Sequence, residues 1–179
     1  MAKVELLVPF IKKHEGGFSN HPNDTGGATM AGVTLATFQS YRKAKGLPSP
    51  TVTDLKNISD AEWTAILKWG YWDRWKADEI NYQPVAHLLV GWAWGSGADA
   101  AIRRFQKLMK LQVDGIVGKN TLAAINSANG KELFWKLILE RKDWFVEICD
   151  KNKSQMVFLK GWLNRLFDNI PYNYNLAEK

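Results

Sequence analysis

Apolar residues recur at helical spacing along most of the chain, whereas strand-like alternation is scarce. The first stripe has the spacing i, i+3, i+4, i+7 and consists of Val4, Leu7, Val8 and Ile11. It predicts a helix that ends at Glu15, with a kink or a restart at Pro9 and an exit through positive φ at Gly16 and Gly17. Because strand signals are few, we expect a predominantly α, multi-helix fold with at most a small sheet.

Capping residues and further stripes predict more helices downstream. Thr34 is placed to cap a helix over residues 35–45, and Ser59 opens a capping-box sequence before another helix. The later predicted helices cover residues 85–94, 98–111, 131–150 and 156–167. Residues 85–94 are apolar on nearly every face, which predicts a central buried helix.

Two regions are expected from the pattern of glycines and charges. The best break is Gly95-Ser96-Gly97, which separates a first region, 1–97, from a helical and more basic second region, 98–179. Within the second region, Asp114-Gly115 predicts a tight turn between two helices. Such αα-hairpins are usually structural, so the residues alone do not assign this turn a binding role.

The segment with the clearest chemistry is the glycine-rich loop after the first helix. Glu15 stands at the C-terminal end of that helix, where the helix dipole disfavours its ionised form, as a general acid requires. Asp24 follows in a loop of Asn, Thr and Gly that favours an ionised carboxylate, and Thr29 offers a hydroxyl to water. Glycoside hydrolysis uses two carboxylates in contrasting environments. An ordinary turn with Asp24 bonded to its own backbone stays open as an alternative.

A family resemblance sharpens this interpretation. The order Glu, eight residues, Asp, four residues, Thr resembles the pattern of phage-type lysozymes. More specifically, the chain resembles glycoside hydrolase family 108, whose members are N-acetylmuramidases, often phage or prophage endolysins, and some of which are called secretion activators. The matching motifs are Glu15-Gly16-Gly17-Phe18, Asn20, Pro22, Asp24, Gly26-Gly27, Thr29, Gly32-Val33-Thr34, Tyr71-Trp72, Trp75, Val85 to Gly97, Val113 to Gly118, Thr121-Leu122 and Gly161 to Arg165.

The resemblance implies a lysozyme-like fold and a muramidase that hydrolyses the β-1,4 bond between N-acetylmuramic acid and N-acetylglucosamine. Glu15 would be the general acid, Asp24 the general base or charge stabiliser, and Thr29 the residue that orients water, with inversion expected and no metal or other cofactor required. Residues expected to bind the substrate are Asn20, His21, Tyr71, Trp72 and Trp94. Relatives usually hold an aspartate where this chain has Gly91, a departure that would weaken activity if that aspartate lines the sugar groove.

Region 1–97 would then be the catalytic region and region 98–179 a peptidoglycan-binding-like region. The net charge of +6, from 24 basic and 18 acidic residues, favours anionic surfaces such as cell-wall polymers. We see no signal-peptide pattern at the N-terminus, and the longest apolar run is too short to span a bilayer. We therefore expect synthesis in the bacterial cytoplasm, no stable membrane insertion and peptidoglycan as partner. Resemblance to endolysins implies action at the wall or periplasm after release through a holin-like export partner.

Other functions stay open at this stage. A non-catalytic cell-wall-binding or secretion-accessory protein would not need Glu15 for its activity. A zinc peptidase or amidase would need histidines at ligand spacing, and His14, His21 and His87 form no such motif. His87 is expected instead to be a hydrogen-bonded core residue. Nucleic acid is not expected as a partner, because the basic residues are scattered and the aromatic residues near Tyr71 match no RNA-stacking motif.

Overall fold

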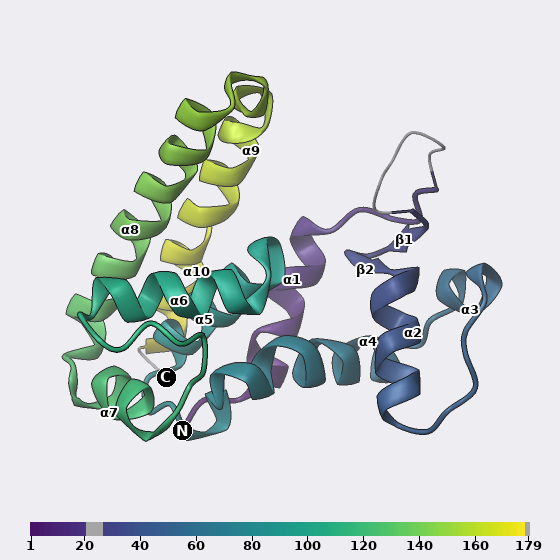
Figure 1. Ribbon diagram of the computed structural model, residues 1–179, viewed down its shortest axis with the longest axis horizontal. Helices are drawn as coiled ribbons and strands as arrows, with labels where there is room; N and C mark the ends of the chain where they lie inside the picture. Colours follow the sequence, from purple (N-terminus) through teal and green to yellow (C-terminus); the bar gives the residue numbers. More distant parts are fainter. Residues whose placement is uncertain (21–26, 178–179) are drawn as a thin grey trace. The chain divides into compact units, whose positions relative to one another are not determined.

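The computed structural model describes residues 1–20 and 27–177, with side chains as far as Asn173. Within these ranges the chain is predominantly helical and forms a two-stranded sheet, which confirms the expected fold class (Figure 1). The chain forms two compact units, an N-terminal unit of Val4–Asp73 and a C-terminal unit of Met1–Lys3 with Arg74–Lys179. The division expected after residue 97 is drawn from motifs and stays a prediction.

The N-terminal unit consists of short helices and one hairpin. Its elements are η1 (Val4–Leu6), α1 (Val8–His14), β1 (Thr29–Met30), β2 (Val33–Thr34), α2 (Leu35–Ala44), α3 (Val52–Lys56), α4 (Asp60–Leu67) and the π-helical turn η2 (Lys68–Trp72). The two predicted caps are present, because Thr34 Oγ1 accepts from the N–H of Thr37 and Ser59 Oγ accepts from the N–H of Glu62, both at 3.1 Å. Instead of closing a capping box on Ser59, the Glu62 carboxylate forms a two-pronged ion pair with Arg42.

The first helix restarts at Pro9, one of the two expected outcomes, but ends differently from its prediction. Residues 4–6 form a separate 3₁₀ turn, so the stripe is divided between η1 and α1. Pro9 lies in the first turn of α1, where its missing N–H costs no hydrogen bond. Glu15 is the first residue beyond α1, with φ −98° and ψ 142°, and neither Gly16 nor Gly17 has a positive φ. The extended backbone at Glu15 itself ends the helix.

The small sheet is an antiparallel hairpin with Thr29 opposite Thr34 and Met30 opposite Val33. Its two turn residues, Ala31 and Gly32, have φ values of 47° and 79°, as a tight hairpin turn requires. The indole N–H of Trp63 in α4 donates to the carbonyl of Ala31 at 2.9 Å. A buried tryptophan therefore holds the tip of the hairpin against a helix.

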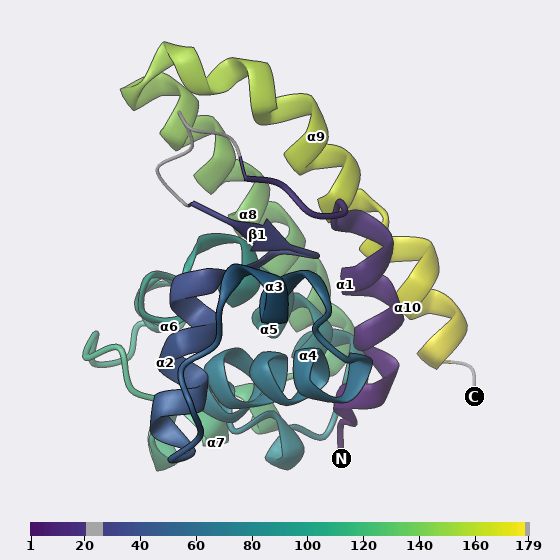
Figure 2. The ribbon, with the colours of Figure 1, turned by 90° about the vertical axis from the view of Figure 1, so that its right-hand side faces the viewer.

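The C-terminal unit is built around one apolar helix. Its elements are η4 (Ala77–Glu79), α5 (Gln83–Ser96), α6 (Ala98–Leu108), α7 (Lys119–Ser127), α8 (Gly130–Lys151), η5 (Lys153–Gln155), α9 (Met156–Phe167) and α10 (Asn169–Ala177), and η3 (Asp73–Trp75) lies at the boundary between the units. Helix α5 packs against α6, α8 and α10 and is buried from Pro84 to Ala93, which confirms the predicted central helix. Figures 1 and 2 show α8 and α9 side by side as an antiparallel pair joined by η5. Among the described helices, none combines the length and apolarity needed to cross a bilayer.

The turn between α6 and α7 is held by one buried side chain, Gln106. Its amide nitrogen donates to Asp114 Oδ1 at 2.7 Å and to the carbonyl of Ile116 at 3.0 Å, while its oxygen accepts from the N–H of Gly115 at 2.9 Å. Gly115 has φ 75°, a conformation that favours glycine. The predicted tight turn at Asp114-Gly115 is confirmed, and Gln106 fixes its geometry.

Candidate active site

The candidate acid, Glu15, occupies the C-terminal cap position of α1 and is half-buried. Its backbone N–H donates to the carbonyl of Lys12 at 3.3 Å. The main chain at Glu15 is therefore still hydrogen-bonded to the last turn of the helix. The preceding His14 packs its ring against Phe10, with centroids 4.8 Å apart. The carboxylate thus lies directly after the end of α1, to which its main chain is hydrogen-bonded.

The loop that follows Glu15 is closed by a β-bridge between Ser19 and Thr29. The N–H of each residue donates to the carbonyl of the other at 2.8 Å, which joins the loop to strand β1. The hydroxyl of Thr29 donates to the carbonyl of Gly27 at 3.2 Å. That bond fixes the hydroxyl rotor and leaves the oxygen lone pairs available to accept from a water molecule.

Sequence reasoning places two further candidates in the same loop. Asp24 and His21 lie outside the described residues, so their roles stay predictions. Asn20 is exposed and directly follows the bridge residue Ser19. Earlier in the loop, Phe18 forms a cation–π contact with Lys56. The Lys56 ammonium lies 4.5 Å from the centre of the Phe18 ring. Both described ends of the loop are therefore anchored.

Tyr71 and Trp72 end the π-helical turn η2, a kind of turn often found at functional sites. Burial raises the pKa of the Tyr71 phenol, and the negative charge of Glu15 raises this pKa further. Tyr71 and Glu15 therefore lie within electrostatic reach of each other, which brings two sequence-predicted site residues together. Trp72 is 0% exposed and presents no ring face to solvent.

The other tryptophans divide between core and partly exposed positions. Trp63, Trp75 and Trp92 are buried, whereas Trp69 and Trp94 are half-buried. Trp69 contacts Tyr41 with centroids 5.6 Å apart in the N-terminal unit, and Trp94 lies near the end of α5 in the C-terminal unit. Throughout residues 1–20 and 27–177 no group of three or more His, Cys, Asp or Glu side chains is arranged to hold a metal ion.

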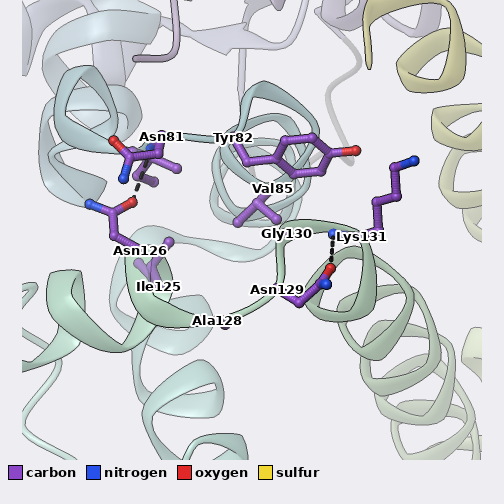
Figure 3. A pocket seen from close by; sticks show the side chains of 10 residues that line it. Asn81, Tyr82, Val85, Ile125, Asn126, Ala128, Asn129, Gly130 and Lys131 are labelled. Atoms are coloured by element: carbon purple, nitrogen blue, oxygen red, sulfur yellow. Dashed lines mark hydrogen bonds between the residues drawn. The ribbon is translucent and has the colours of Figure 1, made fainter. Parts of the chain in front are cut away.

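Figure 3 shows a cavity of about 430 Å³ in the C-terminal unit, where the chain before α5 faces the α7–α8 junction. Two of its three amide side chains, those of Asn126 and Asn129, form hydrogen bonds within the fold. Asn126 accepts from the N–H of Asn81 at 2.9 Å and donates to the carbonyl of Glu79 at 2.8 Å. Asn129 caps α8 by accepting from the N–H of Lys131 at 3.1 Å. These polar groups shape the α7–α8 turn.

Sequence reasoning missed a buried arginine in the C-terminal unit. Arg141 interrupts the apolar stripe of α8 and is only 4% exposed, and its Nη2 donates to the carbonyl of Gly91 at 3.2 Å. Gly91 is the position where the family resemblance led us to expect an aspartate. A charged residue on a core stripe was the available signal, because Phe134, Leu137 and Phe145 occupy the same face.

Comparisons with known proteins agree with this architecture. The family described as Glycosyl hydrolase 108 matches residues 8–97, and the Predicted Peptidoglycan domain matches residues 100–167. A solved structure, described as the structure of Brucella abortus SagA, is similar with a TM-score of 0.79 and 26% sequence identity, over 98% of this chain and 96% of that chain. No curated protein matches the sequence. The chain therefore belongs to the Glycosyl hydrolase 108 family and carries the Predicted Peptidoglycan domain after it.

Proposed function

We propose that the protein is an N-acetylmuramidase that cleaves the β-1,4 bond between N-acetylmuramic acid and N-acetylglucosamine in peptidoglycan. The observation that carries the proposal is the position of Glu15, which leaves a helix end half-buried and within electrostatic reach of Tyr71. A half-buried carboxyl group held beside a helix end has the position that a general acid needs to reach a bound sugar. Membership of a glycoside hydrolase family supports this assignment.

In the proposed mechanism Glu15 gives its proton to the glycosidic oxygen as the bond to the anomeric carbon breaks. A water molecule attacks that carbon from the opposite face and loses a proton to Asp24, so both carboxyl groups change protonation state once per turnover. Thr29 accepts a hydrogen bond from this water, because its own proton is already donated to Gly27. A water placed between two carboxyl groups leads to inversion at the anomeric carbon.

The aromatic residues of η2 have separate roles in this proposal. Tyr71 is half-buried and offers its phenol edge to the sugar next to the cleaved bond. Trp72, being fully buried, supports Tyr71 from behind instead of stacking on the substrate. Asn20 is exposed at the loop mouth and is proposed to bind a sugar hydroxyl or N-acetyl group.

The test compares wild type with Glu15→Gln and a matched control, Glu5→Gln, which makes the same change at an exposed acid in η1. Release of reducing ends from purified peptidoglycan is measured, and borohydride reduction followed by mass spectrometry identifies the new reducing sugar. We expect wild type and Glu5→Gln to release reducing N-acetylmuramic acid, and Glu15→Gln to be slower by about 10²- to 10⁴-fold. Circular dichroism confirms that each variant is folded.

Three results would overturn the proposal. Activity retained by Glu15→Gln would remove Glu15 from the role of acid. A folded wild type that releases no reducing ends yet sediments with peptidoglycan would instead identify a non-catalytic wall-binding protein. Reducing N-acetylglucosamine in place of N-acetylmuramic acid would assign the cleavage to the other β-1,4 bond of the polymer.

A further inference from the structure

A second cavity in the C-terminal unit, of about 370 Å³, lies between the end of α5 and the α8–α9 pair. The side chains important here are those of Arg141, Trp144, Trp162 and Arg165, with the backbone of Gly95 at the α5 edge. Two guanidinium groups and two indoles thus line one hollow. The volume corresponds to about a dozen water molecules, which is more than a bare inorganic ion fills.

Arg141 is buried in this cavity, and no carboxylate among the described residues pairs with it. Its Nη2 donates to the carbonyl of Gly91, its guanidinium lies 5.5 Å from the centre of the Phe145 ring, and its Nε–H has no hydrogen-bond partner. Burial and the nearby positive charge of Arg165 lower the pKa of Arg141 to about 9, and no acidic side chain opposes them. At neutral pH the group is therefore a buried cation that lacks an anion.

Arg104, in the same unit, is an arginine whose charge is balanced by carboxylates, and it serves as a comparison for Arg141. It forms ion pairs with Glu140 and with both carboxylate oxygens of Glu147, at 2.7 and 2.8 Å for Glu147, and the Glu147 hydrogen bonds are the main reason why its pKa is raised. Two carboxylates of α8 thus satisfy Arg104, while none of the described residues does so for Arg141. A buried charge without a counter-ion is unfavourable. An anion that enters the cavity would therefore be stabilised by pairing with the Arg141 guanidinium.

We propose that this cavity binds a free carboxylate of the peptidoglycan peptide stem. The guanidinium fork of Arg141 binds a carboxylate in two-pronged fashion, and the indoles of Trp144 and Trp162 pack against the adjoining apolar atoms of the peptide. An aromatic lining favours an organic anion over phosphate, and stem carboxylates are the organic anions of this polymer. The choice of peptide rests on the proposed function and on the Predicted Peptidoglycan domain, which includes these residues of α8 and α9.

Binding is tested with the full chain by isothermal titration calorimetry. The probes are the stem peptide L-Ala-γ-D-Glu-L-Lys-D-Ala and the same peptide with its carboxyl groups amidated. We expect the acidic peptide to bind wild type, and amidation to weaken this binding about 10- to 100-fold because the charge-assisted hydrogen bonds are lost. Arg141→Met should weaken binding of the acidic peptide by a similar factor. Lys142→Met, which removes the same charge from the next, more exposed residue, should bind it like wild type.

A second pair of variants tests whether a carboxylate of the protein itself can occupy the site. A Cβ built at Gly95 lies 3.5 Å from Arg141 Nη2, an ordinary contact distance, so a carboxylate at this position reaches the guanidinium. We expect Gly95→Asp to compete with the acidic peptide and weaken its binding at least about 10-fold, while Gly95→Ala binds it like wild type. Gly95→Asp also tests the site without removing the arginine, and thermal unfolding verifies the fold of every variant.

The proposal is wrong if the acidic peptide does not bind wild type, if the amidated peptide binds equally well, or if Arg141→Met leaves binding unchanged. These outcomes are separable from a failure of the proposed enzyme. Glu15→Gln should keep peptide binding while it loses release of reducing ends. Arg141→Met should keep the release of reducing ends from glycan strands stripped of their peptides.

Discussion

Acidification should destabilise the protein through one buried histidine. His87 in α5 is 0% exposed, and its ring stacks on Tyr172 with centroids 5.7 Å apart. The side chain of Asn173 is near enough to favour the protonated ring slightly, yet neither ring nitrogen makes a hydrogen bond of normal geometry. The expected core position of His87 is confirmed, whereas a hydrogen bond of normal geometry is absent from its two ring nitrogens. Burial lowers the pKa of His87 from 6.5 to about 3.

The sign and size of the effect follow from this pKa difference. Between pH 6.5 and about 3 the unfolded chain carries a proton on His87 and the folded protein does not, so protons bind the unfolded state and favour unfolding. Stability from this group is complete above pH 6.5 and falls as the pH decreases. The slope approaches about 1.4 kcal/mol per pH unit, and the full shift corresponds to about 5 kcal/mol.

The assay is urea unfolding of wild type and His87→Met at intervals between pH 7.5 and pH 4. Methionine has a similar volume and does not titrate, and the carboxyl groups common to both proteins cancel in the difference. We expect the difference in free energy of unfolding to shift in favour of His87→Met by about 1.4 kcal/mol for each pH unit below 6.5. A difference that stays constant with pH would refute the reasoning, because it would mean that His87 titrates equally in both states.

Two further predictions concern packing in the C-terminal unit. Gln106→Glu places an acceptor where Nε2 now donates to Asp114 and to the carbonyl of Ile116, so we expect a loss of about 2–4 kcal/mol relative to wild type in urea unfolding at pH 7. This loss relative to wild type should be smaller at pH 4, where the new carboxyl group protonates, and a loss that is equal at both pH values would contradict the prediction. At Gly130, in the cavity of Figure 3, a Cβ would lie 2.6 Å from Cδ1 of Tyr82. Gly130→Ala should therefore lower stability by about 1–3 kcal/mol, and Tyr82→Ala in the same chain should cancel much of that loss.

Long amphipathic helices could be predicted from the sequence because their stripes repeat over several turns. The bounds of α9, Met156–Phe167, are those expected, and α8 differs from its expected range by one residue at each end. Helix α3 was missed, since five residues are too few to show a period. Its only signal was a capping box in which Thr51 accepts from the N–H of Asp54 at 3.3 Å and Asp54 accepts from the N–H of Thr51 at 2.7 Å.

The motif proposes Glu15 and Thr29 as site residues from residue type and spacing, and these roles stay predictions. The structure adds the bridge that ties Thr29 to Ser19. The burial of the aromatic residues was not predictable from the sequence. Tyr71 and Trp72 are adjacent in the π-helical turn η2, yet Tyr71 is half-buried and Trp72 is fully buried. A helical period applied to residues 60–72 does not describe a π-helical turn.

Among the described residues, two titratable side chains are buried at α5: His87 lies within this helix and Arg141 contacts it, and the two differ in their charge at pH 7. His87 accommodates burial by staying neutral, since its pKa is lowered to about 3 and no charge remains to be balanced at pH 7. Arg141 has no such route, because a pKa lowered to about 9 still leaves it charged at pH 7. A neutral histidine is compatible with an apolar core, whereas a charged arginine needs an anion. This difference is why we assign a ligand to the cavity at Arg141 and only a stability role to His87.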